Sequence, residues 1–120
     1  MKTRVLTLIF LTLAFAASAA AAPSSSSSTT LHISAKAAGL AFSTTHLTAR
    51  HGTVTIMMKN LSPLPHDISI KGLGINKKGK LVAKGGTSIV TAVLKKGSYT
   101  FLCTVPGHAA AGMKGKLTIT

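Results

Sequence analysis

Short runs of alternating, β-branched residues recur along the chain after residue 50, and they limit the fold more than any other feature. Strand-like length and alternation are found in residues 53–59, 66–71, 87–94, 98–103 and 115–120. Turn-forming Gly, Lys and Asn residues separate these runs. A further strand is plausible at 31–36, the stretch 40–47 is ambiguous, and sustained helical periodicity is absent. We therefore predict an all-β domain, an antiparallel Greek-key sandwich of about seven or eight strands.

The N-terminus has the pattern of a secretory signal. Lys2 and Arg4 precede an apolar run at 5–22 that ends in small residues. We expect cleavage after Ala20, so that residues 1–20 form a signal peptide and the protein is exported to the periplasm, the cell envelope or the exterior. Retention of the run as a membrane anchor is the alternative, because it is nearly long enough to span a bilayer.

A polar stretch rich in serine follows the apolar run. Residues 21–30, which include PSSSSSTT, cannot bury enough apolar surface to fold, and we expect a flexible linker there. The folded domain is then predicted at 31–120, which is large enough for one small core.

The chain is strongly basic. It has 14 Lys and Arg residues and one acidic residue, a net charge of +13, and loss of Lys2 and Arg4 with the signal peptide would leave +11. Such a surface favours anionic partners, for example an envelope polymer, lipid headgroups or an acidic protein. We do not expect nucleic acid as a partner, because the protein is predicted to be exported and has no nucleic-acid-binding motif.

Cys103 is the only cysteine, so an exported form of this chain has no internal disulfide. A disulfide-linked dimer would account for the thiol, but not for the residues after it in CTVPGHAAAGMKG. His108 and Met113 lie at successive intervals of five residues, and a thiolate, an imidazole and a thioether on one loop suit copper. A blue-copper site also needs a second imidazole. His66 is the best candidate, since it follows a proline-stiffened loop and begins a predicted strand, whereas the other histidines lie in polar, loop-like surroundings.

The segments NLSPLPHD and YTFLCTVPGHAAAGMKGKLTIT resemble the cupredoxins, type 1 blue copper proteins of the plastocyanin and azurin family. The preceding LTARHGTVTIMMKN is similar to the strand that leads to the first histidine of that family, so the resemblance spans residues 40–120. It implies that one copper ion per chain is bound by His66, Cys103, His108 and Met113. The CTVPGH segment is like azurin, and the longer Cys-x4-His-x4-Met spacing is similar to the rusticyanin type.

Asp67, the one acidic residue, departs from the family pattern, which usually has Asn or Ser at this position. We expect its carboxylate to accept hydrogen bonds from the backbone or hydroxyl of Thr104, and an ionised carboxylate there would favour Cu(II). An exposed aspartate paired with a lysine is the alternative.

The resemblance implies a monomeric one-electron carrier between redox partner proteins, with electrons leaving through His108. It is not expected to be an enzyme, since a site of this kind has no open coordination position and a multicopper oxidase or nitrite reductase needs further histidine clusters. The alternative function is that of a periplasmic or extracellular copper carrier or storage protein.

Strand directions also predict where the cations lie. We expect Lys71, residues 76–80, residues 95–97 and Arg50 at the end opposite the copper, where they would form a basic pole for an anionic surface. Only Lys59 and Lys114 are expected near the metal.

Overall fold

The computed structural model describes residues 12–20 and 26–120. Residues 12–20 have no regular secondary structure, and in the described part of the chain no helix is long and apolar enough to cross a membrane. The predicted signal peptide and linker lie partly outside the described residues.

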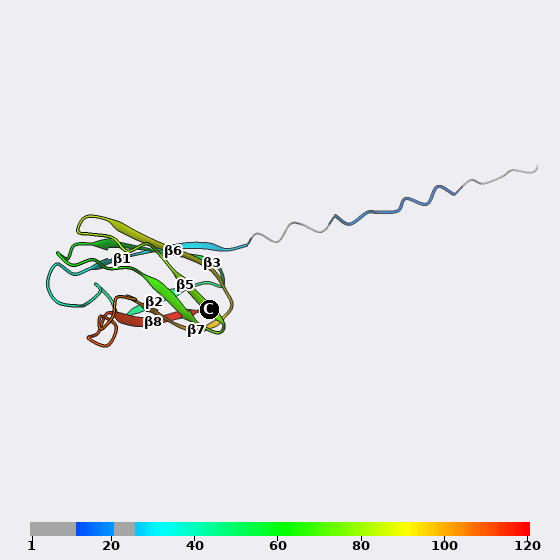
Figure 1. The fold of residues 1–120 in the computed structure, drawn as a ribbon. Helices are drawn as coiled ribbons and strands as arrows, with labels where there is room; N and C mark the ends of the chain where they lie inside the picture. Colours follow the sequence, from blue (N-terminus) through cyan, green and yellow to red (C-terminus); the bar gives the residue numbers. More distant parts are fainter. Residues whose placement is uncertain (1–11, 21–25) are drawn as a thin grey trace, which may run out of the picture.

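Eight strands in the described residues form two sheets that face each other (Figure 1). The first sheet has the order β1 (Ser28–Ala35), β3 (Gly52–Asn60), β6 (Thr87–Leu94). The second sheet has the order β2 (His46–Ala49), β8 (Lys114–Ile119), β7 (Gly97–Leu102), β4 (Ser69–Gly72), β5 (Ile75–Lys78). The predicted all-β sandwich is confirmed.

Two of the strand pairs, β1 with β3 and β2 with β8, are parallel, while the other pairs are antiparallel. The parallel pairing of β1 with β3 follows from the path of the chain, which leaves the first sheet after β1, forms β2 in the second sheet and returns as β3. Parallel neighbours require a crossover of this kind, whereas antiparallel neighbours can be joined by a tight turn. β1 begins at Ser28, so the last residues of the predicted linker lie in a strand.

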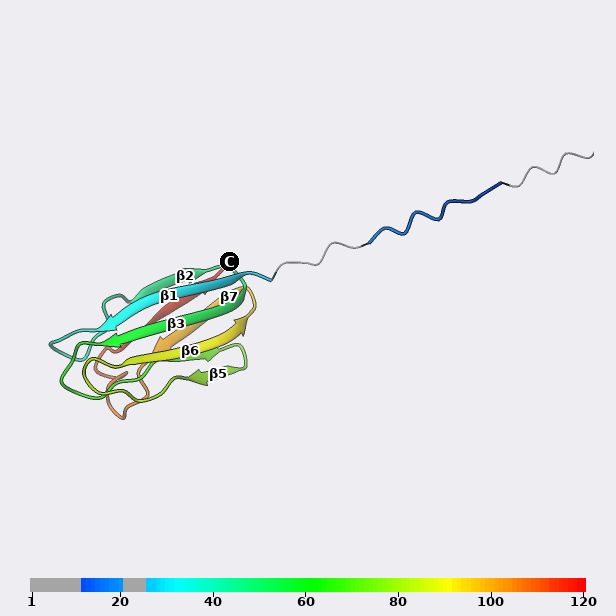
Figure 2. The ribbon, with the colours of Figure 1, turned by 90° about the horizontal axis from the view of Figure 1, so that it is seen from above.

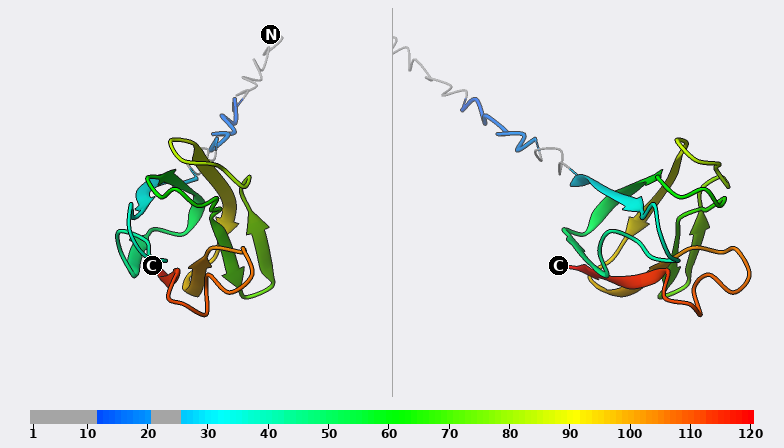
Figure 3. Two further views of the ribbon diagram at one scale, coloured as in Figure 1. Left: turned by 60° about the vertical axis from the view of Figure 1, so that its left-hand side comes forward. Right: turned by 90° about the vertical axis from the view of Figure 1, so that its left-hand side faces the viewer.

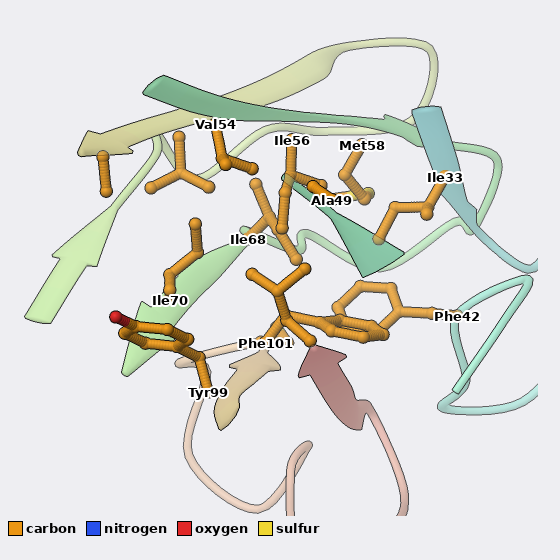
Figure 4. Packing of buried hydrophobic residues seen from close by; sticks show 14 of the residues in the cluster. Ile33, Phe42, Ala49, Val54, Ile56, Met58, Ile68, Ile70, Tyr99 and Phe101 are labelled. Carbon is orange, nitrogen blue, oxygen red and sulfur yellow. The ribbon is translucent and has the colours of Figure 1, made fainter. Parts of the chain in front are cut away.

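The core lies between the two sheets, as the strict alternation of β6 illustrates, in which every second residue is buried. Val54, Ile56 and Met58 of β3 point across the sandwich towards Phe101 of β7 (Figure 4). Phe42 packs against Phe101 with ring centroids 5.8 Å apart. Burial of each such side chain stabilises the folded state by about 1.5–3 kcal/mol.

The sandwich has two functionally different ends. At one end, which we call the cysteine end, β7 stops at Leu102 and β8 starts at Lys114, and the loop between them faces the viewer in the right-hand view of Figure 3. At the opposite end β6 turns into β7. Gly52 pairs there with Leu94, and Gly97 pairs with Ile119.

The predicted position of the lysines in residues 76–80 is wrong. The chain turns at Gly72–Gly74, so β5 runs back towards the cysteine end, in the same direction as β1 and β3 (Figure 2). Lys78 pairs with Ser69, which also pairs with Leu102, the residue before Cys103. Residues 95–97 and Arg50 do lie at the opposite end, where β6 meets β7 and β2 meets β3. The basic charge is therefore not confined to one end.

Candidate metal centre

The loop from Cys103 to Met113 is fastened at both ends. Cys103 follows β7 and Met113 precedes β8, and the Cys103 N–H donates to the Met113 carbonyl over 3.1 Å. The Met113 N–H donates in turn to the His108 carbonyl over 3.1 Å, and the His108 N–H to the Val105 carbonyl over 3.0 Å. This closed loop fixes the backbone of three predicted ligands, and it holds Cys103 and Met113 fully within the core.

His66 reaches the same place from a different segment. It does not begin β4, as predicted, but lies three residues before it in an isolated bridge with Val82. The two residues exchange backbone hydrogen bonds of 3.1 and 3.0 Å. His66 is completely buried, so its imidazole has one fixed position inside the cysteine end.

Asn60 supports the loop that delivers His66, and sequence reasoning missed this role. Its side-chain amide donates to the carbonyls of Leu64 and Val82, at 2.8 and 2.9 Å, while its amide oxygen accepts from the Ser62 N–H at 2.9 Å. Asn60 is fully buried at the end of an apolar strand. A polar residue at an inward position of a strand was the signal available in the sequence.

The structure brings His66, Cys103 and His108 into one group whose donor atoms lie within 4.8 Å of one another. The two Nδ1 atoms are 3.1 Å apart, and the Cys103 Sγ lies 3.8 Å from His66 Nδ1 and 3.6 Å from His108 Nδ1. Cys103 and His66 are buried, and His108 is partly exposed. One access route to the group therefore runs past the His108 ring.

The two sulfur–nitrogen spacings and the chemistry of the donors fit a metal ion, while the 3.1 Å between the Nδ1 atoms is a few tenths of an ångström shorter than a shared trigonal plane requires. Bonds of about 2.0 Å to nitrogen and 2.3 Å to sulfur, as in zinc sites, place donors in a shared trigonal plane about 3.5–4 Å apart. Two imidazoles and a thiolate with a weak thioether above them are typical of blue copper. In the described part of the chain, His66 Nε2 is a buried nitrogen without a hydrogen-bond partner, which leaves its Nδ1 as the atom that faces the other donors.

Burial changes the acid–base properties of two of the donors. The pKa of His66 is lowered, first by burial and then by His108, with Asp67 acting weakly in the opposite sense. A lowered pKa keeps the imidazole neutral, the form that binds metals. Burial also raises the pKa of the Cys103 thiol, so a bound ion must displace a proton from the sulfur.

Asp67 is 4% exposed and braces the cysteine loop, so the alternative of an exposed aspartate is wrong. Its Oδ1 accepts the Thr104 N–H at 2.6 Å, and its Oδ2 accepts a short hydrogen bond from the Thr104 hydroxyl. Asp67, the residue after His66, is the only acidic residue in the sequence. Its side chain is therefore hydrogen-bonded to Thr104, the residue after Cys103.

The other histidines of the described chain lie elsewhere. His32, His46 and His51 are exposed, and none of them belongs to the metal-binding group. Their separation from the site agrees with the prediction that they are not ligands.

A two-sheet sandwich with a His, Cys, His group buried at one end defines a cupredoxin. Residues 29–120 match the profile described as copper binding proteins, plastocyanin/azurin family. The chain therefore belongs to the plastocyanin/azurin family of copper-binding proteins.

Solved structures similar to the chain include three auracyanins. Auracyanin A, a blue copper protein from the green thermophilic photosynthetic bacterium Chloroflexus aurantiacus, is 31% identical with a TM-score of 0.68, over 78% of this chain and 100% of its own. Dithionite-reduced auracyanin from the photosynthetic bacterium Roseiflexus castenholzii is 29% identical with a TM-score of 0.68, over 80% and 99% of the two chains. Auracyanin B, at 22% identity and a TM-score of 0.70 over 82% and 93%, supports the fold alone. No curated protein matches the chain.

Proposed function

We propose that this protein is an exported one-electron carrier with a single type 1 copper ion held by His66, Cys103 and His108, with Met113 as the weak axial ligand. The observation that carries the proposal is the convergence of two imidazole nitrogens and the thiol sulfur in a buried position. Copper bound there would supply the exchange between Cu(II) and Cu(I).

The residues around the site favour electron transfer because they hold the donors still. The closed loop holds Cys103, His108 and Met113, and the backbone bridge to Val82 holds His66. The hydrogen bonds from Thr104 to the Asp67 carboxylate join the two segments. Donor atoms that keep their positions in both oxidation states of the metal give electron transfer a small reorganisation energy. Burial of Cys103 and Met113 excludes water from the sulfur atoms.

His108 is the proposed exit for the electron. It is partly exposed, and Leu61 and Leu64 leave apolar surface at the same end, 42% and 48% exposed. Small alanines at 109–111 follow His108 and would let a partner protein approach the imidazole edge. Apolar surface with few hydrogen-bonding groups suits brief contacts between redox partners.

Copper carriage or storage is the second candidate. Cu(I) sites of that kind use soft sulfur ligands, whereas this group has two imidazoles beside one thiol. In the described residues there is one such cluster. The proposed carrier would lie in the periplasm, at the cell envelope or outside the cell, as a monomer that meets redox partner proteins.

Electron self-exchange of the copper-loaded protein tests this proposal. We expect fast self-exchange that slows in Ala110→Asp, because a carboxylate at the contact must lose water, and that is unchanged in the control Ser98→Asp, at the opposite end of β7. Slow exchange in the parent protein, together with ready release of copper to a chelator, would favour carriage instead.

A further inference from the structure

We propose that the end of the sandwich opposite the metal centre is a docking surface for an anionic lipid membrane, and that the protein sits there with its copper end pointing away from the bilayer. This inference concerns a different surface from the metal site and does not depend on which metal is bound.

Three exposed cations lie close together at the opposite end, although other lysines lie towards the cysteine end. Arg50, Lys95 and Lys96 are exposed, and they occupy the turns between β2 and β3 and between β6 and β7. Asp67, the only acidic residue of the sequence, is hydrogen-bonded to Thr104 at the cysteine end. Lys or Arg near an anionic bilayer contributes to binding without a specific partner geometry.

Exposed apolar side chains accompany these cations. Val93 is 72% exposed and, with Leu94, lines a hollow of about 450 Å³ together with His51, Gly52, Lys95 and Lys96. Leu73 is 58% exposed at the tip of the β4–β5 turn. A side chain built on Gly97 would meet Leu73 Cδ1 at 2.6 Å, so this leucine lies directly beside the turn that holds the two lysines.

Leu73 is also held in an unusual conformation. Its φ of 46° lies in the left-handed region, and it is the one non-glycine residue in the described chain with a positive φ. Glycine or asparagine is normally found in such a position. A left-handed leucine with more than half of its surface exposed keeps an apolar side chain available to an external apolar phase.

The combination selects a membrane over a soluble polyanion. Lysines alone would serve for a polymer or an acidic protein, whereas apolar tips flanked by lysines fit the boundary between lipid headgroups and acyl chains. The turn is rigid enough to present them, since the Tyr99 hydroxyl donates to the Lys95 carbonyl over 2.9 Å.

The direction of the chain agrees with this orientation. The Ser27 carbonyl accepts the Thr53 N–H at 2.9 Å, and Ser28 pairs with Thr53, so the polypeptide joins the sandwich at this same end. The apolar run at 5–22 precedes that point in the sequence. An apolar run held in a membrane would therefore connect to the domain through the end that carries Arg50 and the two lysines.

Partitioning of the full chain onto lipid vesicles tests the proposal. Sedimentation is compared between phosphatidylcholine vesicles and vesicles that also contain phosphatidylglycerol, at low and high salt. The lysine pair is removed in Lys95→Gln/Lys96→Gln, with Lys78→Gln/Lys80→Gln as the control of equal charge change. The apolar tip is removed in Leu73→Asn, with Leu81→Asn as the control, because Leu81 is 59% exposed outside this surface.

At an ionic strength of about 0.1 M, the lower of the two salt concentrations, loss of the lysine pair should lower partitioning onto anionic vesicles about 30-fold. The control pair should change it less than about threefold, since Lys78 is level with Ser69 and lies about 13 Å from the Leu73 turn, beyond the Debye length of about 10 Å at that ionic strength. Residues before Ser26 are identical in all variants, so their own membrane affinity cancels in the comparison.

Leu73→Asn should lower partitioning about tenfold while leaving the urea midpoint unchanged or higher, because asparagine tolerates the left-handed conformation. Equal losses in both lysine pairs would overturn the proposed surface. Unchanged partitioning in Leu73→Asn, with loss only in Lys95→Gln/Lys96→Gln, would overturn the membrane in favour of a soluble polyanion or an acidic protein.

Discussion

The carboxylate of Asp67 accepts both the backbone N–H and the hydroxyl of Thr104, and so it links the residue after His66 to the residue after Cys103. The two segments are 37 positions apart in the sequence. A single side chain therefore controls the relative position of two predicted ligands, and it does so with the one acidic group that the sequence contains.

Asp67→Asn should raise the reduction potential of the copper protein. An asparagine oxygen can still accept the Thr104 N–H, but it carries no negative charge to favour Cu(II). A lost interaction of about 1 kcal/mol corresponds to about 40 mV for a one-electron couple. Voltammetry of both proteins measures this, with Thr104→Val as the control that removes only the hydroxyl hydrogen bond. An unchanged or lower potential in Asp67→Asn would show that the carboxylate does not act on the metal.

Cys103→Ser should abolish the intense visible band of the copper protein and leave the β-sandwich folded. The band requires a thiolate, whereas Cys103 lies just beyond β7 and adds little to the sheet. Absorption spectra and circular dichroism test the two parts of the prediction. A serine variant that stays blue would contradict the assignment of Cys103 as a ligand.

Met113→Leu should keep the blue colour and raise the reduction potential. A weak axial donor stabilises Cu(II) modestly, so its loss favours Cu(I). Leucine has a similar volume, and the change at this fully buried position should cost less than about 1.5 kcal/mol of unfolding free energy. Complete loss of copper in this variant would mean that Met113 is a principal ligand instead of an axial one.

Asn60→Ala should destabilise the protein by about 2–4 kcal/mol in urea unfolding, because the carbonyls of Leu64 and Val82 and the N–H of Ser62 all lose a buried partner. The exposed Asn76 of β5 provides a matched control, and Asn76→Ala should change the stability by less than about 0.5 kcal/mol. Similar effects of the two substitutions would rule out Asn60 as the support of the His66 loop.

Local patterns in the sequence predicted the parts of this structure that depend on neighbouring residues. The sequence predicted a strand with alternating residues at 87–94, and β6 has these bounds and buries every second residue. The spacing of Cys103, His108 and Met113 identified the loop that carries them. The position of His66 after a proline-stiffened loop made it the best candidate for the second imidazole, and the family resemblance implied the same residue.

Features that depend on distant partners could not be predicted in this way. The role of Asn60 depends on Val82, 22 residues away, and the isolated bridge of His66 depends on the same residue. The turn at Leu73 was missed because the predicted turn lay in residues 76–80, so strand β5 was not predicted and its lysines were expected at the wrong end.

Addition of Cu(II) to the purified, metal-free protein, followed by visible and EPR spectra, tests the central claim most directly. We predict saturation at one copper ion per chain, with the intense blue band and the EPR spectrum of a thiolate-bound type 1 centre. A colourless product with a tetragonal Cu(II) spectrum, or failure to bind copper, would contradict a type 1 site at His66, Cys103, His108 and Met113.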